Sequence, residues 1–414
     1  MIFPLIVLVL FILIQLAYKE EHKSMRPAIV AVGYNRPEGM RRLLESIGNA
    51  QYMVSDIPLI ISIDESNLSD EVEKVAREFN WKYGAKEIRR FPERQGLRRH
   101  IIQCGDYSEK YGAVIILEDD LVVAEDFYEY TCRAHEKYEK DERICGVSLY
   151  SYNINVFTRF MFCPARSVYD VYLGDMVVTW GQSWTSDQWK KFKEWYFEHE
   201  DKLPTTNPNM PQKISTWTRS WGRYFASYIV DKGLSYIYPY QSRTTCFSDY
   251  GEHNKSVVPI TFVQVPLMQG LPSKYKFGEF QELVHYDSFF ERVLDKRHTI
   301  CGISGENICL DTNNMKTIAG KKKYVVTNEI LPHKLIASFG LTLRPICMNV
   351  IQEVPGEELY LYQLNGDQIR PYKNEKIQYC TNRRRLRYEH FDMPWRTALI
   401  YALKEFFSRI KESL

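Results

Sequence analysis

The sequence lacks the cysteine patterns that mark a disulfide scaffold or a structural zinc site. Its nine cysteines form no CxxC pair and no cluster with histidine at zinc-ligand spacing. Cys301 and Cys309 lie close enough in the chain to pair in an oxidising compartment, but we favour ordinary buried thiols. With 45% hydrophobic residues, the chain is instead able to build a sizeable core.

The sequence also has little net charge and no repeated or low-complexity segment. Its formal charge of +2 gives no general attraction to nucleic acid, whose binding proteins carry a concentrated basic surface. We therefore expect no nucleic-acid partner. The 414 residues exceed the usual length of one compact domain, which favours two folded units.

Basic residues are missing from the beginning of the chain. Residues 1–18 are nearly all apolar and long enough to span a bilayer. No Lys or Arg precedes them and no small-x-small site ends them, which favours an uncleaved anchor over a signal peptide. Because Lys19, Lys23 and Arg26 follow the span, we expect a single-pass bacterial inner-membrane protein with a cytoplasmic catalytic domain. The Golgi lumen is the alternative, to which two Asn-X-Ser sequons weakly point.

Short apolar runs alternate with amphipathic stretches from Pro27 to Leu149. This alternation predicts an α/β fold with a mainly parallel sheet and helices on both faces. The expected strands are 28–33, 57–63, 86–91, 113–117 and 144–149. The expected helices are 37–47, 70–79, 97–110 and 125–140. Asp70 and Glu73 have the spacing of a capping box at the start of the second helix.

The composition changes in the second half of the chain. A region rich in Trp and Tyr follows Tyr150, and beyond about Pro272 the chain gains Lys, Asn and Gly. We therefore expect an α/β domain over residues 25–270 and an accessory domain over residues 271–414. Residues 394–414 predict an amphipathic helix, which either packs on the core or lies on an anionic membrane surface.

Three adjacent carboxylates, Glu118, Asp119 and Asp120, follow directly after the apolar strand 113–117. Such close negative charges repel one another and raise their pKa values unless a cation compensates them. Ligands of open parallel sheets collect at the carboxyl ends of the strands, which is where these acids fall. Oxygen ligands suit Mg²⁺ or Mn²⁺, so the sequence predicts a divalent metal site that also meets diphosphate oxygens. Turn acids ahead of a helix are the alternative.

Several segments, in this order, resemble motifs of family 2-like GT-A glycosyltransferases. Residues 30–37 resemble the first strand and loop of that family, and residues 61–66 resemble the second strand, whose terminal Asp contacts the nucleoside. Residues 95–98 look like the loop before the third helix, and residues 118–121 look like the metal motif. The fuller pattern is also similar to the N-acetylglucosaminyltransferase of complex N-glycan branching, over residues 28–253.

The resemblance implies a GT-A fold, a nucleotide-sugar donor, and a glycan or lipid-linked acceptor. The donor-binding residues that we predict are Asn35, Arg36, Asp64, Arg98, Glu118 and Asp119. The last acid of the motif is the family's usual direct ligand, which implies Asp120 as the metal ligand. The segment Gly251-Glu252-His253 looks like the family's closing loop and implies His253 as a second ligand.

An aromatic segment predicts the acceptor side of the site. Trp180, Gly181 and Trp184 resemble the Trp-Gly-Trp acceptor segment of bacterial polysaccharide transferases. Aromatic faces pack on the apolar faces of sugar rings, and a glycine lets the backbone approach closely. Core packing is the alternative interpretation for these residues.

The catalytic base is where the sequence departs from the family. An inverting transfer needs a carboxylate to take the acceptor's proton, and the family often places an Asp after the Trp that corresponds to Trp217. Here that residue is Thr218, which is no base at neutral pH. Asp187 is our first candidate, with Asp249 or Glu252 as the second.

The sequence thus predicts a metal-dependent, inverting glycosyltransferase that builds a surface polysaccharide at the cytoplasmic membrane face. A sugar-nucleotide-forming nucleotidyltransferase is one alternative, since it shares the sheet and the metal acids. The other alternative is a catalytically weak or inactive tethered protein that binds glycans or acts as a scaffold, as Thr218 suggests.

Overall fold

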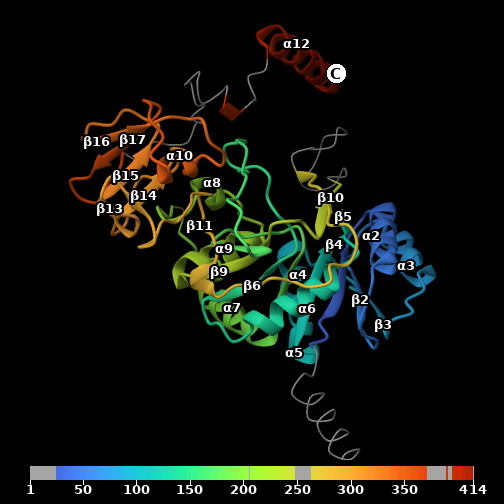
Figure 1. Cartoon of the computed structure of the whole chain (residues 1–414). Helices are drawn as coiled ribbons and strands as arrows, with labels where there is room; N and C mark the ends of the chain where they lie inside the picture. Colours follow the sequence, from blue (N-terminus) through green and yellow to red (C-terminus); the bar gives the residue numbers. More distant parts are fainter. Residues whose placement is uncertain (1–24, 205, 248–262, 371–387, 390–393, 414) are drawn as a thin grey trace, which may run out of the picture.

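The computed structural model describes residues 25–204, 206–247, 263–370, 388–389 and 394–413. Its main feature is a mixed α/β arrangement around a nine-stranded sheet (Figure 1). The predicted α/β fold with a large central sheet is therefore confirmed. Cys301 and Cys309 are both free, but only Cys309 is the expected buried thiol, whereas Cys301 is exposed.

The central sheet has the strand order β11-β7-β9-β6-β8-β4-β1-β2-β3. Its strands are β1 (Ala28–Gly33), β2 (Leu59–Ile63), β3 (Lys86–Arg90), β4 (Ala113–Glu118), β6 (Ile144–Ser148), β7 (Val171–Gly174), β8 (Gln182–Thr185), β9 (Ser235–Pro239) and β11 (His285–Tyr286). Strands β1 to β4 run parallel, whereas β8 runs antiparallel between β4 and β6. The carboxyl ends of β1, β2 and β4 therefore share one edge of the sheet.

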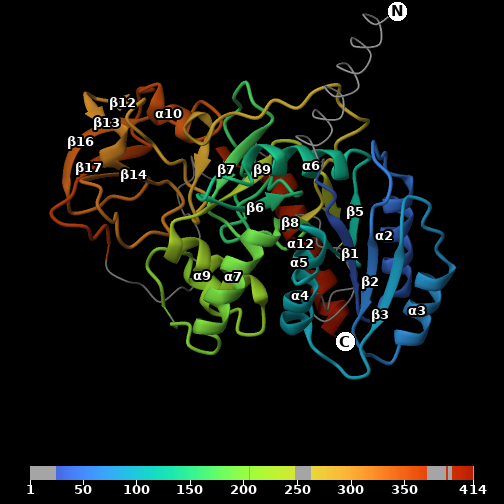
Figure 2. The same cartoon turned by 90° about the horizontal axis from the view of Figure 1, so that it is seen from below.

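Helices cover both faces of this sheet. Successive side chains of a strand point to opposite faces, and along most of β4 they are apolar and buried on both. Ile115 and Leu117 of β4 pack with α2 (Pro37–Asn49), α3 (Ser69–Glu78) and α6 (Phe127–Tyr138). Val114 and Ile116 pack in the other core, on the opposite face. The helices of that face are α4 (Leu97–Gly105), α5 (Tyr107–Tyr111), α7 (Ser186–His199), α8 (Gln212–Ser215) and α9 (Trp221–Lys232) (Figure 2).

The predicted elements before residue 150 all occur in the structure, with two local differences. The predicted helix 97–110 is divided at Asp106 into α4 and α5. The predicted capping box is wrong, because α3 starts after Leu68, which makes no side-chain cap. Asp70 and Glu73 bind Arg90 instead, since a guanidinium is a stronger partner for a carboxylate than a backbone N–H.

A second sheet with its own hydrophobic core lies in the C-terminal part of the chain. Its strands, in spatial order, are β14 (Ile308–Asp311), β15 (Tyr324–Thr327), β17 (Leu359–Gln363) and β16 (Lys334–Phe339). Helix α10 (Cys347–Ile351) packs on the same core. Figures 1 and 2 both show this sheet at the opposite end of the molecule from β1, β2 and β3. The domain boundary near residue 270 stays a proposal, which this second core supports.

Short elements complete the described structure. They are the paired strands β5 (Leu121–Val123) and β10 (Thr244–Cys246), the paired strands β12 (Thr299–Ile300) and β13 (Ile303–Ser304), the 3-10 turns η2 (Phe280–Glu282) and η3 (Gly305–Asn307), and helix α12 (Trp395–Ser413). The predicted terminal helix is thus present as α12. Leu399, Leu403 and Phe406 on this helix are exposed and do not pack in the core.

The predicted location in a membrane requires correction. None of the helices in the described residues is both long and apolar enough to cross a bilayer, which contradicts the expected single-pass protein. The predicted anchor itself, residues 1–18, lies outside the described residues. Neither the cytoplasmic location nor the Golgi alternative is shown.

His135 of α6 is completely buried and is held in one protonation state. Ser183 Oγ donates its hydrogen to the carbonyl of Val114 at 2.8 Å, so it accepts from His135 Nε2 at 2.7 Å. The proton therefore sits on Nε2, while the buried Nδ1 has no hydrogen-bond partner within the described structure. Burial lowers the pKa of this imidazole to about 3.

We expect this histidine to make the fold sensitive to acid. An unfolded His titrates near pH 6.5. Because the pKa is lower in the folded state, the unfolded chain binds the proton first, and stability is lost as pH falls from about 6.5 toward 3. His135→Phe should therefore show a smaller drop in Tm between pH 7 and pH 5 than the wild type. The partly buried His199 provides the control variant, His199→Phe; equal acid sensitivity of His135→Phe and wild type would contradict the prediction.

Candidate active site

The loops after β1, β2 and β4 meet at the carboxyl edge of the central sheet. The parallel register pairs Gly33 of β1 with Ile63 of β2, and Val32 of β1 with Glu118 of β4. The first residues beyond these strands therefore begin at nearly the same level of the sheet. They include Tyr34, Asp64 and Asp119, so the structure brings together the segments in which the sequence predicts donor binding.

The acidic turn after β4 lies directly against the loop that starts α2. The backbone N–H of Tyr34 donates to Asp119 Oδ2 at 3.2 Å, and Asp119 is almost completely buried. A Cβ on Gly39 would stand 2.5 Å from the carbonyl oxygen of Asp119, so only glycine permits this close approach. The guanidinium of Arg36 binds the carboxylate of Asp119 and also contacts Asp120 Oδ2 at 3.2 Å.

One guanidinium does not balance the three carboxylates of this turn. Burial, together with the charges of Asp120 and Asp119, raises the pKa of Glu118 to about 8 against the lowering effect of Arg36. Burial also raises the pKa of Asp119 to about 6, because it outweighs the favourable charge of Arg36. The raised pKa values of both groups come first from burial and then from the negative charge of Asp120. Carboxylate oxygens are the kind of ligand that a hard divalent cation prefers.

The three acids do not act as a single set of ligands. The described residues contain no group of three or more His, Cys, Asp or Glu side chains placed to hold a metal ion. Glu118 and Asp119 are successive residues at the end of a strand, where side chains turn to opposite faces. Asp120 lies in the turn that follows, with its side chain partly exposed.

Asp64 is saturated by backbone groups in this structure. Its Oδ1 accepts the N–H groups of Glu65 at 2.9 Å and Gln95 at 2.7 Å, and its Oδ2 accepts that of Gly96 at 2.9 Å. Gly96 has a φ of 74°, which favours glycine at this position, and α4 begins directly after it. Asp64 therefore links the end of β2 to the loop that starts α4, and little of its carboxylate is left for a nucleoside.

The other predicted donor-binding residues differ in their surroundings. Asn35 is half-buried in the loop between β1 and α2, next to Arg36. Arg98 donates to the hydroxyl of Tyr224 at 2.7 Å and lies 3.4 Å from Asp201. Arg98 is thus engaged with α9, so a contact with diphosphate would have to replace these bonds. The predicted roles of both residues stay predictions.

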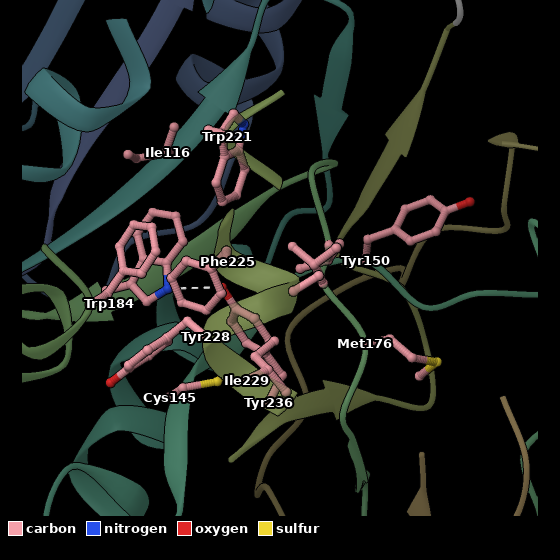
Figure 3. Packing of buried hydrophobic residues seen from close by; sticks show 14 of the residues in the cluster. Ile116, Cys145, Tyr150, Met176, Trp184, Trp221, Phe225, Tyr228, Ile229 and Tyr236 are labelled. Carbon is pink, nitrogen blue, oxygen red and sulfur yellow. Dashed lines mark hydrogen bonds between the residues drawn. The ribbon is translucent and has the colours of Figure 1, made fainter. Parts of the chain in front are cut away.

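The predicted acceptor role of Trp184 is wrong, because this side chain is completely buried. Figure 3 shows it beside Phe225, and its indole N–H donates to the hydroxyl of Tyr236 at 2.8 Å. Its ring also packs on Trp221. Core packing, the alternative interpretation, is the correct one for Trp184, since no ring face is left for a sugar.

Trp180 and Gly181 lie where β8 begins, at the same edge as the acidic turn. Trp180 is half-buried and packs on Tyr150 and Tyr152 with ring centroids 4.9 and 5.8 Å away. A Cβ on Gly181 would stand 2.8 Å from the methyl group of Thr244, so the glycine allows β10 to pack closely here. Trp180 remains the predicted acceptor contact of this segment.

The predicted catalytic base Asp187 is wrong as well. Strand β8 is antiparallel to β4 and pairs Thr185 with Ala113, so Asp187 lies beyond the amino end of β4. Ala113, at the amino end of β4, is seven residues of extended chain away from Asp120, a distance of roughly 20 Å. Asp187 is exposed at the start of α7 and pairs with Lys191 at 2.8 Å. The remaining candidates for the base and the second metal ligand lie outside the described residues: Asp249, Glu252 and His253.

The structure also shows a buried ion pair that sequence reasoning missed. Arg243 binds Asp126 Oδ2 at 3.0 Å, and both side chains are buried. Arg243 precedes β10, and the N–H of Phe247 donates to the carbonyl of Asp120 at 2.8 Å after that strand. The pair therefore fastens β10 next to the acidic turn. The two residues lie 117 positions apart, and this spacing contains no signal of a contact.

Comparison with known proteins supports the predicted class of this site. The sequence matches the model of the GNT-I family over residues 13–199, which include β1, β2, β4 and the acidic turn. This match supports the predicted glycosyltransferase activity. The match also confirms the predicted resemblance, and the central sheet is consistent with the GT-A type. None of the curated proteins with which the sequence was compared matches it.

Solved structures of glycosyltransferases show a limited likeness to this chain. The mannosyltransferase PcManGT from Pyrobaculum calidifontis, in complex with GDP-Man and Mn²⁺, is 13% identical over 52% of this chain and 55% of its own, with a TM-score of 0.33. TarS 1–349 from S. aureus with UDP-GlcNAc is 8% identical over 56% and 61%, with a TM-score of 0.36. GalNAc-T7 with UDP, GalNAc and Mn²⁺ is 13% identical over 54% and 44%, with a TM-score of 0.35. The chain thus spans about half the length of these proteins.

Proposed function

We propose that this chain is a glycosyltransferase, which moves a sugar from a nucleoside diphosphate to a glycan or lipid-linked acceptor with the help of a divalent cation. The observation that carries the proposal is the meeting of three strand ends at one sheet edge. There, Arg36 and the loop after β1 lie against Asp119 and Asp120. This arrangement of a cationic side chain against two carboxylates at the carboxyl ends of parallel strands supports the binding of a metal-bound diphosphate there.

The chain's own residues would divide the work between donor and acceptor. Asp120 would hold Mn²⁺ or Mg²⁺, with His253 as the predicted second ligand, and the bound cation would stabilise charge on the leaving diphosphate. Asp64 holds the loop at Gln95 in place beside the predicted nucleoside pocket. Trp180 would present its exposed part to the acceptor.

We further propose that the transfer inverts the anomeric configuration. This requires a carboxylate base, and Asp249 and Glu252 are the candidates that remain after the exclusion of Asp187. Thr218 is exposed and has no basic group at neutral pH. A product that retains the donor's configuration would contradict this part of the proposal. The role in surface polysaccharide synthesis stays a prediction.

The decisive test is cation-dependent donor binding by the wild type and by Asp120→Asn. We expect one donor among UDP-, GDP- and dTDP-sugars to raise the Tm only when Mn²⁺ is present. In Asp120→Asn, that stabilisation should disappear and transfer should fall by about 10²–10³-fold, because charge stabilisation of the leaving group is lost.

Glu125→Gln is the matched control for this test, since Glu125 is a nearby acid that binds Gln51. It should behave as the wild type does. Release of pyrophosphate would identify the nucleotidyltransferase alternative. If no donor shifts the Tm of the wild type, the proposed function is refuted and the scaffold alternative takes its place.

A further inference from the structure

Arg36 occupies the acidic turn at the position where a metal-bound donor would have to enter. It stands at the N-cap of α2, and its two terminal nitrogens contact different carboxylates. One nitrogen binds the buried Asp119, and the other lies 3.2 Å from the partly exposed Asp120. The guanidinium thus neutralises part of the charge that would otherwise attract a cation to Asp120.

The two contacts of Arg36 are unequal in how easily they can be given up. Asp119 is almost completely buried and also accepts the N–H of Tyr34, so its position is fixed by the fold. Asp120 keeps about a fifth of its side-chain surface exposed, as does Arg36. A small rotation of the guanidinium can therefore release Asp120 while the bond to Asp119 stays in place.

We propose that Arg36 takes the place of the cation before the donor binds and transfers from Asp120 to the diphosphate when cation and nucleotide arrive together. This inference rests on the proposed function, because it assigns a step of donor binding at the same site. The exchange conserves ion pairs: Asp120 passes from a guanidinium to a divalent cation, and the guanidinium passes from a carboxylate to phosphate oxygens. Guanidinium binds both kinds of oxyanion in the same forked geometry.

This exchange predicts effects of opposite sign for the cation alone and for the cation with nucleotide. Without Arg36, Mn²⁺ no longer competes with the guanidinium for Asp120, so the affinity for Mn²⁺ alone should rise. The nucleoside diphosphate loses a partner at the same time, so its affinity in the presence of Mn²⁺ should fall. A side chain that merely supports the fold of the turn would weaken both.

The experiment measures binding to the full chain by calorimetry and by the Mn²⁺ spin-resonance signal. For Arg36→Gln, we expect about tenfold tighter binding of Mn²⁺ alone and about tenfold weaker binding of UDP or GDP with saturating Mn²⁺. Arg41→Gln is the matched control, since it removes one positive charge from the same helix at a residue that pairs with Glu38. It should leave both affinities near the wild-type values.

Arg36→Lys keeps the test informative if the loss of charge unfolds the turn. Lysine carries the charge without the fork, so it should still weaken Mn²⁺ binding relative to Arg36→Gln but bind the diphosphate less well than arginine does. If Arg36→Gln binds Mn²⁺ no more tightly than the wild type does, the inference is overturned. The proposed function would still stand in that case, provided that the wild type binds the donor. Absence of Mn²⁺ and nucleotide binding in every variant would overturn both.

Discussion

Replacing Arg243 with methionine is expected to lower the free energy of unfolding by about 3–5 kcal/mol. The guanidinium is buried against Asp126, and its removal leaves a buried carboxylate without a countercharge. The hydroxyl of Tyr275, 3.1 Å from the same oxygen, offers a hydrogen bond but no charge. Urea denaturation followed by circular dichroism measures this loss directly.

The double variant Arg243→Met with Asp126→Asn separates the charge effect from simple packing. If the unpaired carboxylate causes the loss, the double variant should recover most of it, because no buried charge then remains. Methionine retains part of the packing of the long arginine side chain, although it loses the contact of the guanidinium with the ring of Tyr130. Equal stability of Arg243→Met and the wild type would refute the assigned role of the pair.

The loss of this ion pair should also disturb the position of the acidic turn. Arg243 precedes β10, which pairs with β5 and continues to the N–H that Phe247 donates to the carbonyl of Asp120. We therefore expect Arg243→Met to weaken cation-dependent donor binding even at temperatures where the protein remains folded. The comparison of Tm shifts by donor and Mn²⁺ in the two proteins measures this effect.

Trp184→Ala is expected to cost about 3–5 kcal/mol of unfolding free energy, whereas Trp180→Ala should cost roughly 1–2 kcal/mol. Trp184 is completely buried, and its loss leaves both a cavity and an unpaired hydroxyl on Tyr236. Trp180 is only half-buried, so less packing is lost with it. The same denaturation measurement on both variants makes the comparison.

For acceptor binding, replacement of Trp180 should have the larger effect and replacement of Trp184 the smaller one. Trp180→Ala should raise the acceptor's KM about tenfold if its ring packs on a sugar, with little change in donor binding. Trp184→Phe, which keeps an aromatic ring in the core, should leave this KM near the wild-type value. A KM effect of Trp184→Phe as large as that of Trp180→Ala would contradict the assignment of Trp184 to the core.

The local elements of the first half could be predicted because their signals are local. Helix α2 shows its buried residues Met40, Leu43 and Leu44 at helical spacing, and β4 is a continuous apolar run that suits a strand covered on both sides. In a parallel sheet, this is enough to place Asp64 and Asp120 at a common edge. The position of the candidate donor site thus followed from the sequence.

The acceptor side could not be predicted in the same way. The segment from Trp180 to Asp187 was expected to serve the site as a unit, but β8 carries its far end away from the acidic turn. Strand direction leaves no trace in a run of four residues, because the side chains alternate in the same way whichever way the strand runs. Asp187 was assigned wrongly for this reason, whereas Trp184 was assigned wrongly because its ring is completely buried in the core.

Sequence alone therefore determined most of the strands and helices before residue 150, which acids follow β2 and β4, and that the chain resembles glycosyltransferases. Only the tertiary structure decided that β8 is antiparallel, that Arg36 lies on the acidic turn, and that Arg243 meets Asp126 across more than a hundred residues. The physical reason is the distance along the chain between the residues that interact. Hydrophobic periodicity and strand-end chemistry are properties of adjacent residues, whereas ion pairs and strand directions are selected by the packing of the whole fold.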